Sequence, residues 1–213
     1  MIQATINFVK KELANAEGGH DWWHILRVWN SAKTIAREEK AEMLVVELAA
    51  LLHDIADAKF NNGDEEIGPQ KARDFMLSQN VDEETVNHVV SIIENMSFKN
   101  SLGKVKFSSP EMLVVQDADR LDAIGAIGIA RCFNYGGFKN NIIYSPDLPP
   151  QLNMSKEEYK ASNGSSINHF YEKLLLLKNK MNTKKGMQLA AQRHQFMEQY
   201  LEQFYAEFKG ECY

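Results

Sequence analysis

Three short stretches of the sequence place histidine, aspartate and arginine among apolar residues. They are His20 to Val28, the pair His53-Asp54, and Gln116 to Asp122. Imidazole nitrogens and carboxylate oxygens together are ligands for Zn, Mn, Fe and Ni. A metal site built from three separate segments is therefore the chemistry to weigh against the simpler interpretation that each side chain is structural.

The pair His53-Asp54 follows a nearly continuous apolar run from Leu44 to Leu52. Such a run is typical of a core helix. Two ionisable groups at its end cost roughly several kcal/mol to bury unless they are paired, hydrogen-bonded or bound to a metal. Because an isolated His-Asp pair is more often structural, the interpretation depends on the other two stretches.

The two flanking stretches put ionisable side chains on predicted helix faces. His24 and Arg27 are three residues apart and share a face, as do Asp119 and Asp122. An aspartate inside an apolar helix is destabilising unless it is paired. Alone, His24 would be an interior histidine and Asp119-Arg120 a surface ion pair. The joint occurrence of the three stretches favours one shared site.

The composition is that of an ordinary soluble globular protein. The chain has 213 residues, 44% of them hydrophobic and 25% charged, and a net charge of -5. This balance argues against binding a nucleic acid polymer or an anionic membrane surface. Two distant cysteines, Cys132 and Cys212, fit a reducing compartment. No apolar run approaches the ~20 residues of a membrane helix, and we expect a cytoplasmic protein.

Helical spacing of apolar residues dominates the sequence, and strand-like alternation is scarce. We therefore predict one all-α domain over residues 1–213. The core, about 1–131, contains a central helix over about Ala41–Ile55 and a later helix from the Ser109-Pro110 cap to about Arg131.

The pattern breaks over about 133–164, where glycines, asparagines and prolines accumulate. We expect a long irregular covering loop there, packed by Phe138, Tyr144 and Tyr159. One short helix within it is predicted by the capping box that begins at Ser155. Two closing helices, about Ser166–Met181 and Thr183–Phe208, would form a C-terminal helical hairpin.

The order of the three stretches resembles the HD superfamily of metal-dependent phosphohydrolases. Residues 24–28 (HILRV) look like the family's H-x-x-R-V, residues 50–55 (ALLHDI) look like its helix with the His-Asp pair, and residues 118–121 (ADRL) look like the segment around its last ligand. The resemblance covers about 1–131. Residues 168–174 and 192–194 are similar to a subgroup of small bacterial HD hydrolases.

The resemblance implies that one divalent cation is bound by His24, His53, Asp54 and Asp119. Such mixed nitrogen and oxygen donors suit Mn²⁺, which we favour, and also Fe²⁺, Co²⁺, Ni²⁺, Zn²⁺ or Mg²⁺. Family members with two metals use further histidines on the helix after the His-Asp pair. Residues 89–97 contain none, which disfavours a dinuclear cyclic-dinucleotide phosphodiesterase. We expect His88, His169 and His194 to be structural.

Other polar residues near the motifs are candidates for catalysis and substrate binding. Asp57 follows Asp54 by three residues and could act as a general base or acid. Arginine has the fork geometry that clamps phosphate, and His20 could face the substrate or support a ligand. The predicted substrate-binding residues are Arg27, His20, Lys59 and Lys173.

The sequence thus predicts a phosphohydrolase for a small phosphorylated molecule, with a nucleotide favoured. Cleavage of a phosphomonoester and of a pyrophosphate by metal-activated water are both open. The alternative is a regulatory HD module that binds a nucleotide without hydrolysing it. A few HD-like proteins use two irons with additional histidines for oxygenase chemistry, and by resemblance this alternative fits least. The apolar stripe of the last helix would also suit a homodimer.

Overall fold

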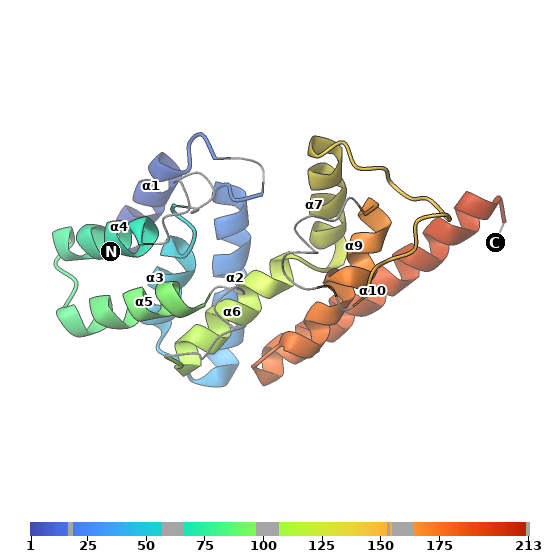
Figure 1. The fold of residues 1–213 in the computed structure, drawn as a ribbon. Coiled ribbons are helices and arrows are strands. Elements are labelled where there is room, and N and C mark those ends of the chain that lie inside the picture. Colours follow the sequence, from blue (N-terminus) through green and yellow to red (C-terminus); the bar gives the residue numbers. More distant parts are fainter. Residues whose placement is uncertain (17–18, 57–65, 97–106, 153, 155–163, 212–213) are drawn as a thin grey trace. The chain divides into compact units, whose positions relative to one another are not determined.

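The computed structural model describes residues 1–16, 19–56, 66–96, 107–152, 154 and 164–211 (Figure 1). Within these ranges all regular secondary structure is helical, which confirms the all-α prediction. None of these helices combines the length and the apolar character needed to cross a membrane. The elements are α1 (Ile2–Glu12), α2 (Trp22–Glu39), α3 (Met43–Leu52), α4 (Ile67–Ser78), α5 (Glu83–Asn95), α6 (Pro110–Asp122), α7 (Gly125–Phe138), α9 (Ser166–Glu172), the 3-10 helix η3 (Leu174–Lys180) and α10 (Lys184–Lys209).

The chain divides into two compact units. Unit 1 contains Met1–Asp119 and Asn182–Gly186, and unit 2 contains Arg120–Met181 and Met187–Tyr213. Helices α6 and α10 therefore each contribute residues to both. The single domain over 1–213 stays a prediction of the sequence.

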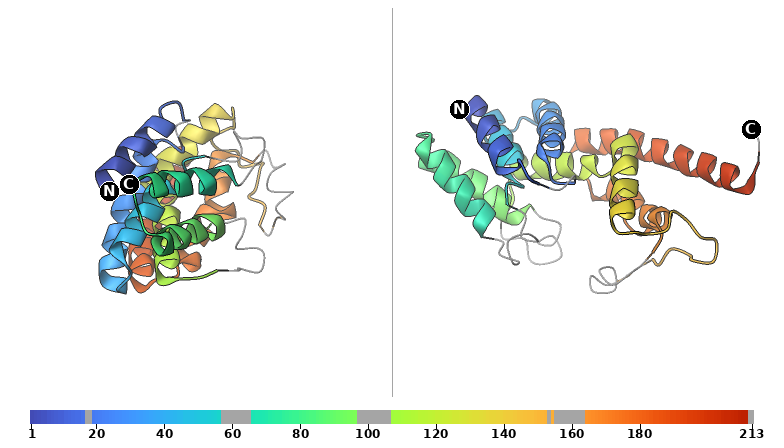
Figure 2. Two further views of the ribbon diagram at one scale, coloured as in Figure 1. Left: turned by 90° about the vertical axis from the view of Figure 1, so that its left-hand side faces the viewer. Right: turned by 90° about the horizontal axis from the view of Figure 1, so that it is seen from above.

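Helix α3 is the centre of unit 1. It lies against α1, α2 and α5, while α4 packs on α5 (Figures 1 and 2). Its residues from Leu48 to Leu52 are fully buried, as expected of a helix that is apolar on most faces. The helix is shorter than predicted and ends at Leu52, so His53 and Asp54 lie in the turn that follows it.

Side-chain caps fix where the helices that carry the site begin. The Asp21 carboxylate accepts a hydrogen bond from the backbone N–H of His24 at 2.9 Å. The Ser109 hydroxyl accepts one from Met112 N–H at 3.1 Å, and α6 begins at Pro110 as predicted. Each cap satisfies a backbone donor that the first turn leaves without a helical partner.

The helix predicted to run from Ser109 to about Arg131 is in fact two helices. Helix α6 ends at Asp122, Ile124 is extended, and α7 starts at Gly125. Gly125 has a φ of +75°, where glycine is strongly preferred. The apolar spacing continues through this turn, which is why periodicity alone missed it.

The irregular segment begins later than predicted, because α7 continues to Phe138. Gly136 is a contact point within this helix and not part of a turn. A Cβ atom there would lie 2.2 Å from the Ser166 hydroxyl of α9, so the glycine permits the close approach of α7 and α9. In this segment Tyr144 packs as expected, whereas Phe138 is 73% exposed and Tyr159 lies outside the described residues.

The C-terminal hairpin is only partly as predicted. Its first arm is the short α9 followed by the 3-10 helix η3, with a break at Lys173, whereas its second arm, α10, matches the prediction closely. Ala190, Met197 and Leu201 of the α10 stripe are buried, and Met187 and Phe208 are exposed. Homodimer formation stays a prediction.

Candidate metal centre

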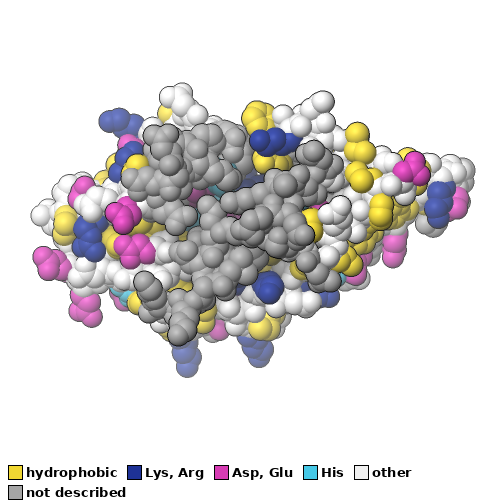
Figure 3. Space-filling model, in the orientation of Figure 1, with side chains coloured by type: hydrophobic (Ala, Val, Ile, Leu, Met, Phe, Trp, Pro, Cys, Tyr) yellow, Lys and Arg dark blue, Asp and Glu magenta, His cyan; other side chains and the backbone are white. Residues whose placement is uncertain are grey.

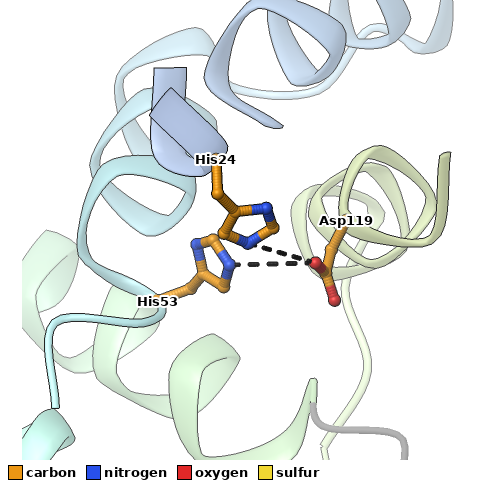
Figure 4. A group of neighbouring side chains, drawn as sticks. All are labelled: His24, His53 and Asp119. Carbon is orange, nitrogen blue, oxygen red and sulfur yellow. Dashed lines mark ion pairs between the residues drawn. The ribbon is translucent and has the colours of Figure 1, made fainter. Parts of the chain in front are cut away.

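Three elements of unit 1 bring two imidazoles and a carboxylate together (Figure 4). His24 comes from the first turn of α2, His53 from the end of α3 and Asp119 from α6. Asp119 Oδ1 is 3.6 Å from His24 Nε2 and 4.0 Å from His53 Nε2. The histidine side chains are 3% and 7% exposed and that of Asp119 is 44% exposed, so the cluster is open on the side of the carboxylate.

Asp54 lies beside this group. Its Oδ2 is 4.0 Å from His24 Nε2 and 2.5 Å from His20 Nδ1. His20 belongs to the segment that precedes α2, and its ring stands edge-on to that of His24. The structure therefore brings His20, His24, His53, Asp54 and Asp119 into one neighbourhood.

A helix cap places His24, and a backbone carbonyl orients the imidazole of His53. The cap by Asp21 starts α2 so that His24 occupies its buried face. His53 Nδ1 is 2.9 Å from the carbonyl oxygen of Ala50. Since a carbonyl can only accept, Nδ1 carries a proton, and Nε2 is the ring nitrogen that faces Asp119 and could bind a metal. Hydrogen bonds of this kind are how proteins orient metal-ligating histidines.

Burial of the Asp54 carboxyl opposes its ionisation. The hydrogen bond from His20 and the nearby imidazoles of His53 and His24 outweigh that effect, and the pKa of Asp54 lies below its usual value. An ionised carboxylate among imidazoles is suited to hold a cation.

The donor spacing fits a single small cation. Bonds from nitrogen or oxygen to such a metal are about 2.0–2.2 Å long, so two donors on one ion can be at most about 4.4 Å apart. Asp119 Oδ1 lies 3.6 and 4.0 Å from the Nε2 atoms of His24 and His53, within this limit. Asp54 Oδ2 lies 4.0 Å from His24 Nε2, at the edge of that three-residue group. The site has no thiolate among these residues, and mixed imidazole and carboxylate donors suit divalent transition metals.

Of the four remaining predicted site residues, the structure describes the positions of Arg27 and Lys173 only. Arg27 is half-buried on α2, one turn after His24. Asp57 and Lys59 lie outside the described residues. Lys173 belongs to unit 2, at the end of α9. The roles of all four stay predictions.

Two histidines expected to be structural have protein partners away from the cluster. His88 Nε2 is 3.0 Å from the Ser109 hydroxyl and 3.4 Å from Glu111 Oε2. His194 Nε2 is 3.2 Å from Glu198 Oε1, one turn later on α10.

Sequence analysis missed the structural role of Asp117, two residues before Asp119. Asp117 is fully buried. Its Oδ1 accepts the N–H of Asn182 at 2.9 Å, and its Oδ2 accepts the N–H and the hydroxyl of Thr183 at 2.7 Å each. The local signal was the Asn182-Thr183 pair just before a helix, which is typical of a cap. Asp117 thus ties the beginning of α10 to α6.

Comparisons with known proteins identify the family of this chain. Residues 22–124 match the HD domain family. The uncharacterized protein YpgQ of Bacillus subtilis is 37% identical over 205 residues, which is 95% of this chain and 91% of YpgQ. An HD-superfamily hydrolase of Bacillus thuringiensis superimposes with a TM-score of 0.79 and 44% identity, covering 99% of this chain and 97% of that one. B. subtilis YpgQ in complex with ADP superimposes with a TM-score of 0.76 and 34% identity, covering 97% of both chains. The chain belongs to the HD superfamily.

Proposed function

We propose that this protein is a metal-dependent phosphohydrolase that acts on a small phosphorylated molecule, with a nucleotide as the favoured substrate. The observation that carries the proposal is the group of His24, His53 and Asp119, whose donor atoms are close enough together for one cation, with Asp54 at its edge. Membership of the HD superfamily supports it.

The four residues would hold one divalent cation, with Mn²⁺ favoured and Fe²⁺, Co²⁺, Ni²⁺, Zn²⁺ or Mg²⁺ compatible with the same donors. When bound, such a cation activates water and offsets negative charge on a phosphoryl oxygen. The buried imidazoles keep the donors in place, and the exposed side of Asp119 leaves room for substrate. Arg27 would clamp a phosphate, and Asp57 would move a proton.

The complex of YpgQ with ADP supports a nucleotide as the ligand. Phosphomonoester and pyrophosphate cleavage remain the two candidate reactions. On the face in Figure 3, basic side chains are scattered among acidic ones in the part that the structure describes. This mixture favours a small substrate over a nucleic acid polymer.

The test begins with purified full-length protein stripped with a chelator and reloaded with Mn²⁺. Nucleoside mono-, di- and triphosphates are then screened for release of phosphate and pyrophosphate. We expect one Mn²⁺ per chain and turnover of at least one nucleotide class. His53→Ala and Asp54→Ala should abolish turnover, whereas His194→Ala, away from the cluster, should retain it.

Two results would contradict the proposal. One is the absence of stoichiometric metal binding, and the other is full activity in both alanine variants of the His-Asp pair. Tight nucleotide binding without turnover under any metal would instead support the regulatory HD module. Arg27→Ala and Lys173→Ala test substrate binding, since loss of a phosphate contact should raise KM about tenfold.

A further inference from the structure

His20 contacts the candidate metal centre from outside its ligand set. It lies in the segment just before α2, and its Nδ1 is 2.5 Å from Oδ2 of Asp54. The ring centroids of His20 and His24 are 5.9 Å apart in an edge-on arrangement. The side chains of His20 and Asp54 are 29% and 18% exposed, so the contact is shielded from solvent on most sides.

The chemistry of the contact fixes the direction of the hydrogen bond. An ionised carboxylate can only accept, so His20 Nδ1 must donate to Asp54. Bonds from a nitrogen donor to an ionised carboxylate are stronger than those between neutral groups. The bond therefore restrains rotation of the Asp54 carboxylate, which lies in the turn after α3.

The same oxygen of Asp54 faces both His20 and His24. Its Oδ2 is 2.5 Å from His20 Nδ1 and 4.0 Å from His24 Nε2. The imidazole of His20 thus holds the carboxylate at the edge of the cluster formed by His24, His53 and Asp119. Groups that hydrogen-bond to metal ligands in this way orient them and typically change metal affinity 10–100-fold.

We propose that His20 is a positioning residue whose Nδ1–H holds the Asp54 carboxylate in the orientation that binds the divalent cation. The inference rests on the proposed function, because it requires Asp54 to be a ligand. In this role His20 supports the metal ligand Asp54 and does not bind the substrate.

Two substitutions separate the donor from the rest of the ring. Asparagine can place its amide nitrogen near the position of Nδ1, whereas glutamine reaches the position of Nε2 and leaves Nδ1 unreplaced. His20→Asn should keep the Mn²⁺ dissociation constant within about threefold of wild type. His20→Gln should weaken Mn²⁺ binding about 10–100-fold. Binding is measured by calorimetry on the chelator-stripped full chain with Mn²⁺ alone.

His88→Gln is the matched control, because the His88 side chain is also 29% exposed and also lies beside a carboxylate, that of Glu111. It should leave Mn²⁺ binding unchanged. Circular dichroism of each stripped variant checks its fold. If His20→Gln does not fold, His20→Ala removes the same donor and should show the same loss.

Equal weakening in His20→Asn and His20→Gln would overturn the inference, since the ring itself would then be needed. Unchanged binding in His20→Gln, with Mn²⁺ bound by wild type, would also overturn it and leave the proposed function standing. Failure of the wild-type chain to bind Mn²⁺ would overturn both.

Discussion

Imidazoles that are at least half-buried lie in both units of the chain, in opposite electrostatic surroundings. In unit 1, His24 and His53 have their Nε2 atoms 3.6 and 4.0 Å from the Asp119 carboxylate. In unit 2, desolvation by burial and the positive charge of Lys173 lower the pKa of His169 to about 4. The first arrangement attracts a cation, and the second keeps an imidazole uncharged.

The interiors of the two units also differ in the kind of side chains that pack there. Unit 1 surrounds α3 with aliphatic side chains and places ionisable groups at its end. Unit 2 is rich in aromatic contacts, including those that join Phe133, Phe170 and Tyr200. The comparison supports the assignment of the proposed metal centre to unit 1, and the following substitutions test that assignment.

The largest effect is expected at Asp119. Asp119→Ala removes the carboxylate that faces both imidazoles and should lower kcat/KM at least about 10³-fold, equivalent to about 4 kcal/mol. Because the side chain is 44% exposed, the free energy of unfolding without metal should change by less than about 0.5 kcal/mol. Nucleotide turnover and urea denaturation measure the two quantities. Activity close to wild type would show that Asp119 is not a ligand.

Asp117→Ala, two residues earlier on α6, should lower the free energy of unfolding, whereas Asp119→Ala should mainly lower activity. Asp117→Ala removes the acceptor of the Asn182 and Thr183 N–H groups, and it leaves the buried N–H of Thr183 without its partner. We expect a loss of about 3 kcal/mol in the free energy of unfolding, measured by urea denaturation of the stripped protein. A stable Asp117→Ala variant would contradict the structural role assigned to this carboxylate.

The parts of the site that depend on local sequence could be predicted. The apolar run before His53 identified the buried helix α3, and Ser109-Pro110 marked the start of α6. Spacing alone could not show that His24, His53 and Asp119 converge. That expectation came from the resemblance to the HD superfamily.

Features that depend on distant contacts could not be predicted. Asp117 bonds to Asn182 and Thr183, which are 65 and 66 residues away, and no periodic pattern reports such a pairing. The turn between α6 and α7 was missed because apolar spacing continues through it, with Gly125 as the local signal. Gly136 resembled a turn residue because its contact with Ser166 is not visible in sequence.

His169 provides a smaller, pH-dependent test of the contrast between the histidines. Its folded pKa of about 4 lies below the ordinary histidine pKa of 6.5, so the unfolded chain binds more protons between these pH values. The resulting stabilisation is complete above pH 6.5 and is lost as pH falls toward 4, with about 2 kcal/mol lost at pH 5.

In His169→Gln, the difference in unfolding free energy between pH 8 and pH 5 should shrink by about 2 kcal/mol. Urea denaturation at both pH values measures it, and an NMR titration of the wild-type imidazole provides a direct check. Titration of His169 near 6.5 would remove the electrostatic contrast between the two units.

The smallest effect is expected in the aromatic packing of unit 2. The Tyr144 ring has its centroid 5.8, 5.4 and 4.9 Å from those of Phe204, Tyr205 and Phe208 on α10. Tyr144→Ala should therefore lower the free energy of unfolding by about 1.5 kcal/mol, as measured by urea denaturation. Tyr135→Ala, whose ring is 55% exposed, is the control and should change it by less than about 0.5 kcal/mol. Both variants should bind Mn²⁺ as tightly as wild type, because the proposed ligands all belong to unit 1. Weaker Mn²⁺ binding in Tyr144→Ala alone would contradict the assignment of the metal centre to unit 1 alone, since aromatic packing in unit 2 would then be required to assemble it.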